Sequence, residues 1–232
     1  MSNQNSASST ILTSYQSNND LLVAQISKLY LPIGCKVADV TYGKGVFWRN
    51  MDMTKYGFFP SDLMSQPKNP PPNLQRYDFT ALPYKDGEFD VVVFDPPYVH
   101  NPGDLIVDKN YQNASTTKGF YHKDIIELYR KGMVEGVRIL KEGGTLWVKC
   151  KDEIESSLQR WSHCEIYELA LAMGLYGKDL FVMTQKQDPI LQHKEQQHAR
   201  KNHSYMWILR KPFTNEYKRL QKVYPQLKGI EK

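Results

Sequence analysis

The sequence has few cysteines and no long hydrophobic run. Its three cysteines, Cys35, Cys150 and Cys164, have a spacing that fits neither a zinc site nor a disulfide framework. We find no stretch of about 20 apolar residues that could cross a membrane, no internal repeat and no secretory-signal pattern. These absences argue against a secreted disulfide scaffold and against a membrane protein. They predict a cytoplasmic protein with reduced thiols.

Two ligand-binding signatures are incomplete. His193, His198 and His203 recur every five residues, but this spacing does not place them on one helix face, so we expect no metal. The loop at residues 41–45 has two glycines, but Trp48 occupies the third glycine position of the dinucleotide fingerprint. The chain also lacks a Gly-Lys-Ser/Thr sequence. A nicotinamide or flavin cofactor and a phosphate-binding P-loop are therefore disfavoured.

Short apolar runs alternate with amphipathic segments along the chain. This alternation predicts an α/β domain with a parallel sheet and right-handed crossovers. The length suits one domain with a sizeable core. We expect strands over residues 36–40, 56–60, 91–94, 145–150, 179–184 and 205–211, and helices over residues 21–30, 122–140 and 158–173.

An Asp-Pro-Pro-Tyr tetrapeptide follows the apolar run of residues 91–94. Ligands bind at this end of the strands in open α/β sheets. The Asp95 carboxylate and the Pro96 carbonyl could accept the N–H bonds of an exocyclic amino group and so aim its lone pair. Pro97 stiffens the turn, and Tyr98 offers a flat face for an unstacked base. The plain alternative is a strand-ending turn.

A glycine loop follows the strand expected over residues 36–40. Gly43 and Gly45 permit positive φ angles and a close approach of the backbone to a ligand. A strand followed by such a loop and a helix is typical of a nucleotide-type cofactor site.

Residues 39–45 and the tetrapeptide together resemble the S-adenosylmethionine-dependent DNA amino-methyltransferases that modify adenine N6 or cytosine N4. Residues 198–205 are similar to the terminal hairpin of that family, and the resemblance spans roughly residues 10–212. It implies a Rossmann-like class I methyltransferase fold, with a mostly parallel seven-stranded sheet and helices on both faces. The family's loop has the sequence Asp-Pro-Phe-x-Gly-x-Gly. Residues 39–45 match its Asp and both Gly positions, whereas Val40 and Thr41 replace its Pro and Phe.

The resemblance also implies roles for individual residues. Asp95, Pro96, Pro97 and Tyr98 would hold the target base. The glycine loop would hold the methionine part of S-adenosylmethionine. Asp62, after the second strand, would bind its ribose, and Asp78 and Phe79 would contact its adenine. Alternatively, the first of these acids caps a turn and the second is a surface residue. The implied cofactor residues are Asp39, Thr41, Tyr42, Gly43, Gly45, Asp62, Asp78 and Phe79, with Thr13 and Tyr15 as candidates ahead of the first strand.

Two regions suit contact with nucleic acid. Residues 99–121 have little periodicity and follow the tetrapeptide, so we expect a mobile loop that closes over a flipped nucleotide. Residues 190–232 hold ten Lys or Arg and three Glu, which favours phosphate contact, although a solvated helix face is the alternative. The expected substrate contacts are Tyr98, Lys109, Tyr111, Lys118, Tyr121, Arg200 and Lys201.

The sequence therefore predicts a disordered tail over residues 1–10, a catalytic domain over residues 11–212 and a basic tail over residues 213–232. The expected reaction, as the resemblance implies, is methyl transfer from S-adenosylmethionine to a base amino group in DNA. Adenine N6 is favoured because, in the resembling family, Asp at the first position of the tetrapeptide is commoner in enzymes that modify adenine. Cytosine N4 and the adenine N6 or guanine N2 of RNA are alternatives, and a protein glutamine or a non-catalytic subunit role is remote. The chain has no room for a separate target-recognition region beyond residues 99–121 and the basic tail, so the alternatives are a very short target site, a homodimer or a partner subunit.

Overall fold

The computed structural model describes residues 10–64, 67–98, 121–185 and 198–227. The expected disordered tail falls almost wholly outside this range. Most of the expected substrate loop, with Lys109, Tyr111 and Lys118, also lies outside the described residues.

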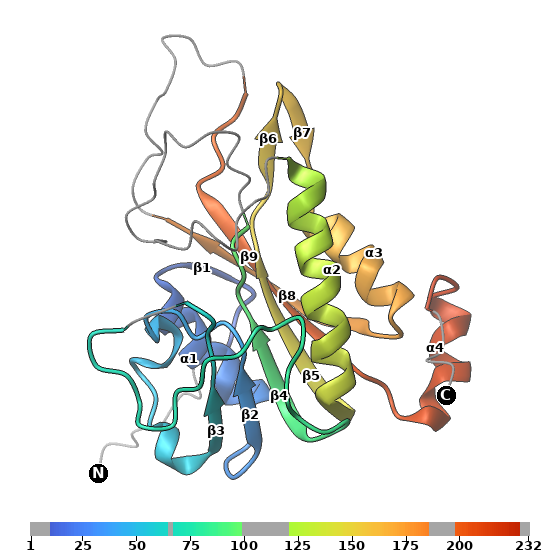
Figure 1. The fold of residues 1–232 in the computed structure, drawn as a ribbon. Helices are drawn as coiled ribbons and strands as arrows, with labels where there is room; N and C mark the ends of the chain where they lie inside the picture. Colours follow the sequence, from blue (N-terminus) through green and yellow to red (C-terminus); the bar gives the residue numbers. More distant parts are fainter. Residues whose placement is uncertain (1–9, 65–66, 99–120, 186–197, 228–232) are drawn as a thin grey trace, which may run out of the picture.

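A seven-stranded sheet runs through the centre of the protein, in the order β1-β8-β9-β5-β4-β2-β3 (Figure 1). Neighbouring strands are parallel except at β9, which is antiparallel to both β5 and β8. The predicted mostly parallel seven-stranded sheet is thus confirmed. The strands are β1 (Ser14–Gln16), β2 (Lys36–Asp39), β3 (Gly57–Pro60), β4 (Phe89–Phe94), β5 (Leu140–Cys150), β8 (Tyr176–Thr184) and β9 (His203–Arg210).

Helices cover both faces of the sheet because the central strands are apolar on both sides. In β4, Val92 and Phe94 belong to the core cluster on one face, whereas Val91 and Val93 belong to the cluster on the other. Helices α2 (His122–Ile139) and α3 (Ser162–Ala172) pack over the first cluster, and α1 (Asn19–Tyr30) and the 3₁₀ turn η1 (Val46–Trp48) pack over the second. None of the described helices is both long enough and apolar enough to span a bilayer.

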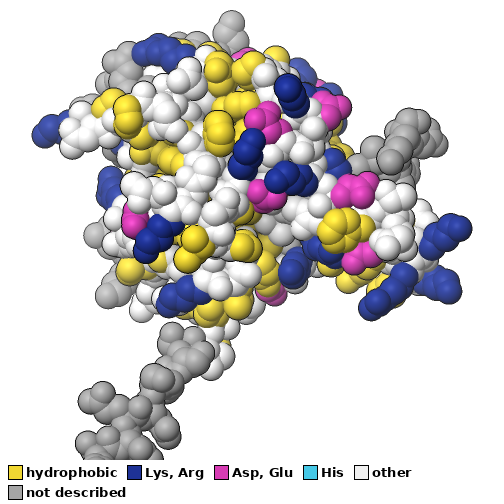
Figure 2. Space-filling view, turned by 90° about the horizontal axis from the view of Figure 1, so that it is seen from below, with side chains coloured by type: hydrophobic (Ala, Val, Ile, Leu, Met, Phe, Trp, Pro, Cys, Tyr) yellow, Lys and Arg dark blue, Asp and Glu magenta, His cyan; other side chains and the backbone are white. Residues whose placement is uncertain are grey.

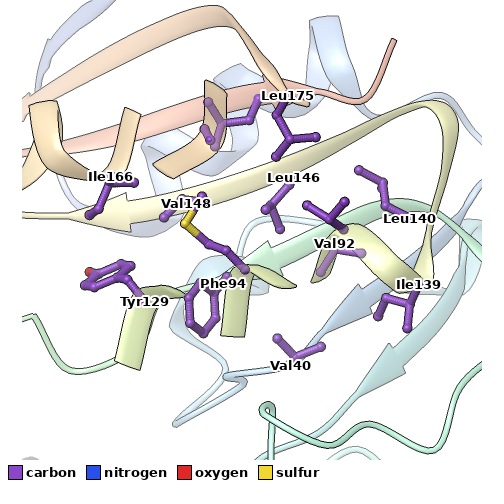
Figure 3. Packing of buried hydrophobic residues seen from close by; sticks show 14 of the residues in the cluster. Val40, Val92, Phe94, Tyr129, Ile139, Leu140, Leu146, Val148, Ile166 and Leu175 are labelled. Carbon is purple, nitrogen blue, oxygen red and sulfur yellow. The ribbon is translucent and has the colours of Figure 1, made fainter. Parts of the chain in front are cut away.

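Helix α2 packs closely on β4. Ile125, Tyr129, Met133 and Val137 recur every four residues and form its buried stripe. Figure 3 shows Tyr129 beside Phe94, and their ring centroids are 5.7 Å apart. A Cβ at Gly132 would lie 2.3 Å from the Phe94 ring, so the small residue permits this approach.

Several boundaries differ from the sequence-based expectation. The helix expected over residues 158–173 begins only at Ser162, because β6 (Glu153–Glu155) and β7 (Leu158–Arg160) form a hairpin before it. Residues 141–144, expected to end a helix, belong to β5. Strand β1 was not expected. The glycine loop leads into the short turn η1 rather than into an α-helix.

Residues 213–227, which belong to the segment predicted as a basic tail, pack on the domain. They contain η3 (Thr214–Glu216) and α4 (Tyr217–Val223). The Tyr217 hydroxyl donates to the Gly174 carbonyl at 2.8 Å, and Leu227 is buried.

Figure 2 views the molecule from below Figure 1, at the end where β2, β4 and β5 begin. Positive and negative side chains lie interspersed on this face of the described residues. Lys36 pairs with Glu88 at 3.7 Å, and Lys141 pairs with Asp90 at 2.6 Å, near these strand starts. This end of the sheet therefore does not offer the single-sign surface that a polyanion would select.

Candidate active site

The glycine loop and the tetrapeptide meet at the carboxyl ends of strands β2 and β4. Strands β2 and β4 are parallel neighbours, with Asp39 opposite Val93, so the segments that follow them emerge side by side. The Asp95 backbone N–H donates to the Thr41 hydroxyl at 2.7 Å, across 54 positions of sequence. This hydrogen bond joins the two motifs that the sequence analysis singled out.

Asp39 organises the glycine loop from inside the protein. It is 2% exposed, and its carboxylate accepts hydrogen bonds from the Trp48 indole at 2.6 Å and from the Thr41 backbone at 3.1 Å. Burial raises the pKa of Asp39 to about 7, although both hydrogen bonds oppose this rise. Trp48, which breaks the dinucleotide fingerprint, thus anchors the acid at the start of the loop.

Replacing Trp48 with phenylalanine removes the indole donor from Asp39. We expect the free energy of unfolding to fall by about 1–3 kcal/mol, because a buried acceptor loses a partner. The loss should be larger at pH 8 than at pH 5, since the raised pKa leaves Asp39 mostly protonated at the lower pH. Urea unfolding at both pH values measures this, with Trp161→Phe, at a 52% exposed tryptophan, as the matched control. If both variants lost the same free energy of unfolding at both pH values, the role of Trp48 as the anchor of Asp39 would be contradicted.

The two loop glycines adopt left-handed conformations, with φ +55° at Gly43 and +66° at Gly45. The Gly43 N–H donates to Asp62 Oδ2 at 2.9 Å, and Asp62 Oδ1 accepts from the Met64 N–H at 3.0 Å. The structure therefore places Asp62 against the loop, where it also caps the turn after β3. The ring of Tyr42 lies over Gly45, since a Cβ there would meet its hydroxyl.

The second expected cofactor acid, Asp78, precedes a ring that packs against the last residue of β4. Asp78 is exposed, and its Oδ1 accepts from the Thr80 backbone at 2.8 Å and from the Thr80 hydroxyl at 2.7 Å. Phe79 packs edge-on against Phe94, with ring centroids 5.1 Å apart. Phe79 therefore lies beside the residue that precedes Asp95.

Asp95 has an unusual environment for a carboxylate. Its Oδ1 atom is buried and has no hydrogen-bond partner among the described residues. Burial raises the pKa of Asp95, and the positive charge of Lys149 opposes that rise. A buried acceptor without a partner is rare in folded proteins, and a substrate N–H could satisfy it.

Lys149 was not among the residues singled out from the sequence. It ends an apolar run in β5, is only 1% exposed, and its ammonium lies 5.8 Å from the centroid of the Tyr98 ring. The available signal was a lysine inside an otherwise apolar strand, since such lysines are almost never fully buried without a partner.

The remaining predicted residues lie elsewhere. Thr13 and Tyr15 lie at or beside β1, the outermost strand on the side of the sheet away from β2 and β3. Their role as cofactor contacts stays a prediction. Tyr121 precedes α2 and is 57% exposed. The Lys201 ammonium donates to Gln159 Oε1 at 2.6 Å in β7, and Arg200 Nε is buried without a partner among the described residues.

No protein-family model matches the chain, and no curated protein matches it significantly. Solved structures do match. A SAM-dependent methyltransferase from Methanosarcina mazei superposes with a TM-score of 0.50 at 12% identity, over 81% of this chain and 97% of that chain. TrmN from Thermus thermophilus superposes with a TM-score of 0.51 at 15% identity, over 83% of this chain and 48% of its own. The present chain thus spans about half the length of TrmN.

A putative DNA modification methylase from Thermus thermophilus, solved in complex with S-adenosylmethionine, matches 56% of this chain and 51% of its own at 18% identity, with a TM-score of 0.40. The two broader superpositions, together with the strand order, establish the architecture. The chain therefore has the Rossmann-like fold of S-adenosylmethionine-dependent methyltransferases.

Proposed function

We propose that this protein transfers a methyl group from S-adenosylmethionine to the exocyclic amino group of a base in DNA, with adenine N6 as the favoured target. The observation that carries the proposal is the buried Oδ1 of Asp95, which has no hydrogen-bond partner within the described chain and whose residue is hydrogen-bonded to the start of the glycine loop. A planar amino nitrogen has a delocalised lone pair and attacks poorly. An acceptor that takes one of its N–H bonds can aim that lone pair.

The cofactor site would lie on the glycine loop. Gly43 and Gly45 would let the backbone approach the methionine part, with Asp62 near the ribose. Asp78 and Phe79 would contact the adenine. Asp39 and Thr41 would shape the loop from beneath, because their polar atoms bond within the protein. Solved proteins with this fold include SAM-dependent methyltransferases, which supports this choice of cofactor.

The chemistry requires positioning more than acid–base strength. When bound, S-adenosylmethionine supplies an electrophilic methyl group. The Asp95 carboxylate and the Pro96 carbonyl would orient the amino nitrogen for in-line attack, and Tyr98 would stack on the extruded base. The nitrogen loses a proton readily after methylation, so Asp95 can act as an acceptor without being a strong base. No covalent enzyme intermediate forms, and the free thiols have no role in the reaction.

Target selection would use residues outside this small centre. Arg200 and Lys201 are candidates for phosphate contact, and a homodimer or a partner subunit would extend the recognition surface. Cytosine N4 and RNA bases present the same amino chemistry to Asp95. We propose adenine in DNA because the tetrapeptide begins with Asp in a loop context similar to the DNA amino-methyltransferases. We also propose that the protein acts in the cytoplasm.

Transfer of labelled methyl from S-adenosylmethionine to DNA and RNA, followed by nucleoside mass spectrometry, tests the proposal. We expect N6-methyladenine in DNA. Label found only in RNA would mean that the substrate is RNA and not DNA, with the same methylation of an amino group. A calorimetric titration with S-adenosylmethionine supplies the control: binding without label in any nucleic acid would contradict the proposed substrate, and absence of binding would contradict the whole assignment.

A further inference from the structure

Lys149 is a buried charge that requires an explanation. Its side chain is inaccessible, and its ammonium donates to Asn19 Oδ1 of α1 at 2.8 Å. The Tyr129 hydroxyl donates to the Lys149 carbonyl at 2.7 Å and so fixes its backbone from the opposite face of the sheet. An amide oxygen compensates only part of the cost of burying an ammonium, which normally requires a paired charge.

The pairing of β4 and β5 places Lys149 beside Asp95. Phe94 lies opposite Val148, so the next residues along the two parallel strands are Asp95 and Lys149. Side chains alternate between faces, and Val93 and Trp147 both belong to the cluster under α1. The side chains of Asp95 and Lys149 thus emerge on that same face, and the charge of Lys149 lowers the pKa of Asp95 against the effect of burial.

The ammonium also lies between the two motifs. It is 5.8 Å from the ring centroid of Tyr98 in the tetrapeptide and 6.0 Å from that of Phe47, which follows the glycine loop in η1. A cation at such distances from an aromatic face is attracted by the ring. The Lys149 ammonium therefore lies near a ring of the tetrapeptide and a ring that follows the glycine loop.

Other titratable groups near Asp95 do not lower its pKa against the effect of burial. Asp39 carries the same charge as Asp95 when ionised and has its pKa raised to about 7. Burial raises the pKa values of Tyr129 and Cys150 far above neutrality, so both stay uncharged. Lys151 is half-buried, and burial together with the charge of Lys149 lowers its pKa. Lys149 is thus the cation that acts on Asp95 in this environment.

We propose that Lys149 is a positioning residue for the methyl transfer, whose ammonium keeps Asp95 ionised as an acceptor and holds the ring of Tyr98 in place. The inference rests on the proposed function. A protonated Asp95 would present an O–H donor to the substrate amino group and lose acceptor capacity, so the site would fail to orient the nitrogen. Lys149 lies beside the residues that would contact substrate and acts through them.

The pH dependence of turnover separates this role from a structural one. We expect Lys149→Met and Lys149→Gln to move the acidic limb of the kcat–pH profile to higher pH, because the pKa of Asp95 rises when the nearby positive charge is lost. At pH 7, kcat should fall about tenfold or more, while the Kd for S-adenosylmethionine changes less than about threefold. Lys149→Arg keeps the charge and should keep the acidic limb near its original position.

Lys211→Met is the matched control. Lys211 is also partly buried, and its ammonium donates to the Val137 carbonyl at 2.8 Å and the Leu140 carbonyl at 2.7 Å, at the other end of β5. Its loss should lower stability and leave the acidic limb in place. An unmoved limb in both Lys149→Met and Lys149→Gln would overturn the proposal. Lys149→Gln keeps a hydrogen-bond donor for Asn19. If Lys149→Met does not fold, the acidic limb of Lys149→Gln alone decides the test.

A second measurement does not depend on methyl transfer. Carbon-13 NMR of the Asp95 carboxyl group gives its titration directly, with Asp95→Asn used for assignment. A higher titration midpoint in Lys149→Met supports the pairing of Lys149 with Asp95, and an identical midpoint overturns it. If the unaltered protein methylates no nucleic acid while this midpoint moves, the proposed function fails and the charge pairing stands.

Discussion

Asp95→Asn is expected to reduce methyl transfer by about 100- to 1,000-fold while S-adenosylmethionine still binds. The amide keeps the size of the carboxyl group and loses its charge. One of its two positions becomes an N–H₂ donor, which would face the substrate amino group instead of accepting from it. The buried Oδ1 has no partner among the described residues, so the substitution breaks no hydrogen bond of that atom within the described fold. The loss should therefore appear in kcat rather than in stability, and Asp95→Ala should be at least as impaired.

Single-turnover transfer of labelled methyl measures this effect, with calorimetry for cofactor affinity and urea unfolding for stability. Asp90→Asn is the matched control, because Asp90 lies on the same strand at the opposite end. Its carboxylate pairs with Lys141 and accepts from the Lys36 N–H, so we expect reduced stability with kcat unchanged. Full activity in Asp95→Asn would refute the mechanism.

Gly45→Ala is expected to weaken binding of S-adenosylmethionine by about tenfold or more, since a left-handed φ costs a non-glycine residue about 1–2 kcal/mol and the added methyl group also displaces Tyr42. Gly45 has φ +66°, and its Cβ would lie 2.3 Å from the Tyr42 hydroxyl. The ring would have to move away from the loop. The site would then lose the shape on which the cofactor is proposed to rest.

Gly87→Ala is the control for backbone strain alone. Gly87 has φ +61°, but a Cβ there meets nothing within 4 Å. We expect Gly87→Ala to lose stability and keep its affinity for S-adenosylmethionine, as calorimetric titration would show. If Gly45→Ala bound the cofactor as tightly as the unaltered protein, the glycine loop would not be the cofactor site.

The sequence predicted the central strands well because they are buried on both faces. The continuous apolar run at residues 91–94 and the short apolar stretch within residues 36–40 indicate such strands without any knowledge of their neighbours, and β4 and β2 confirm them. The hydrogen bond between Asp95 and Thr41 could not be predicted, because it depends on β2 and β4 being adjacent and in register.

Two other features were hidden for local reasons. The β6–β7 hairpin turns at Ser156 and Ser157, which adopt φ +49° and +64° without the glycine or asparagine that usually marks such a turn. Residues 158–161 consequently resembled the start of the helix that follows. The proposed role of Lys149 depends on Asp95 and Asn19, which are distant in sequence and approach Lys149 only in the folded protein.

Strand β1 has a consequence for any shortened form of this protein. It pairs in parallel with residues 182–184 at the carboxyl end of β8, whose other neighbour is β9, so it covers backbone groups there that would otherwise be unpaired. A chain trimmed beyond Gln16 would uncover these three residues and extend the open edge of β8, which could then recruit a strand from another molecule. Aggregation of such a trimmed protein would then reflect edge-to-edge association, and it would say nothing about the chemistry at the opposite side of the sheet.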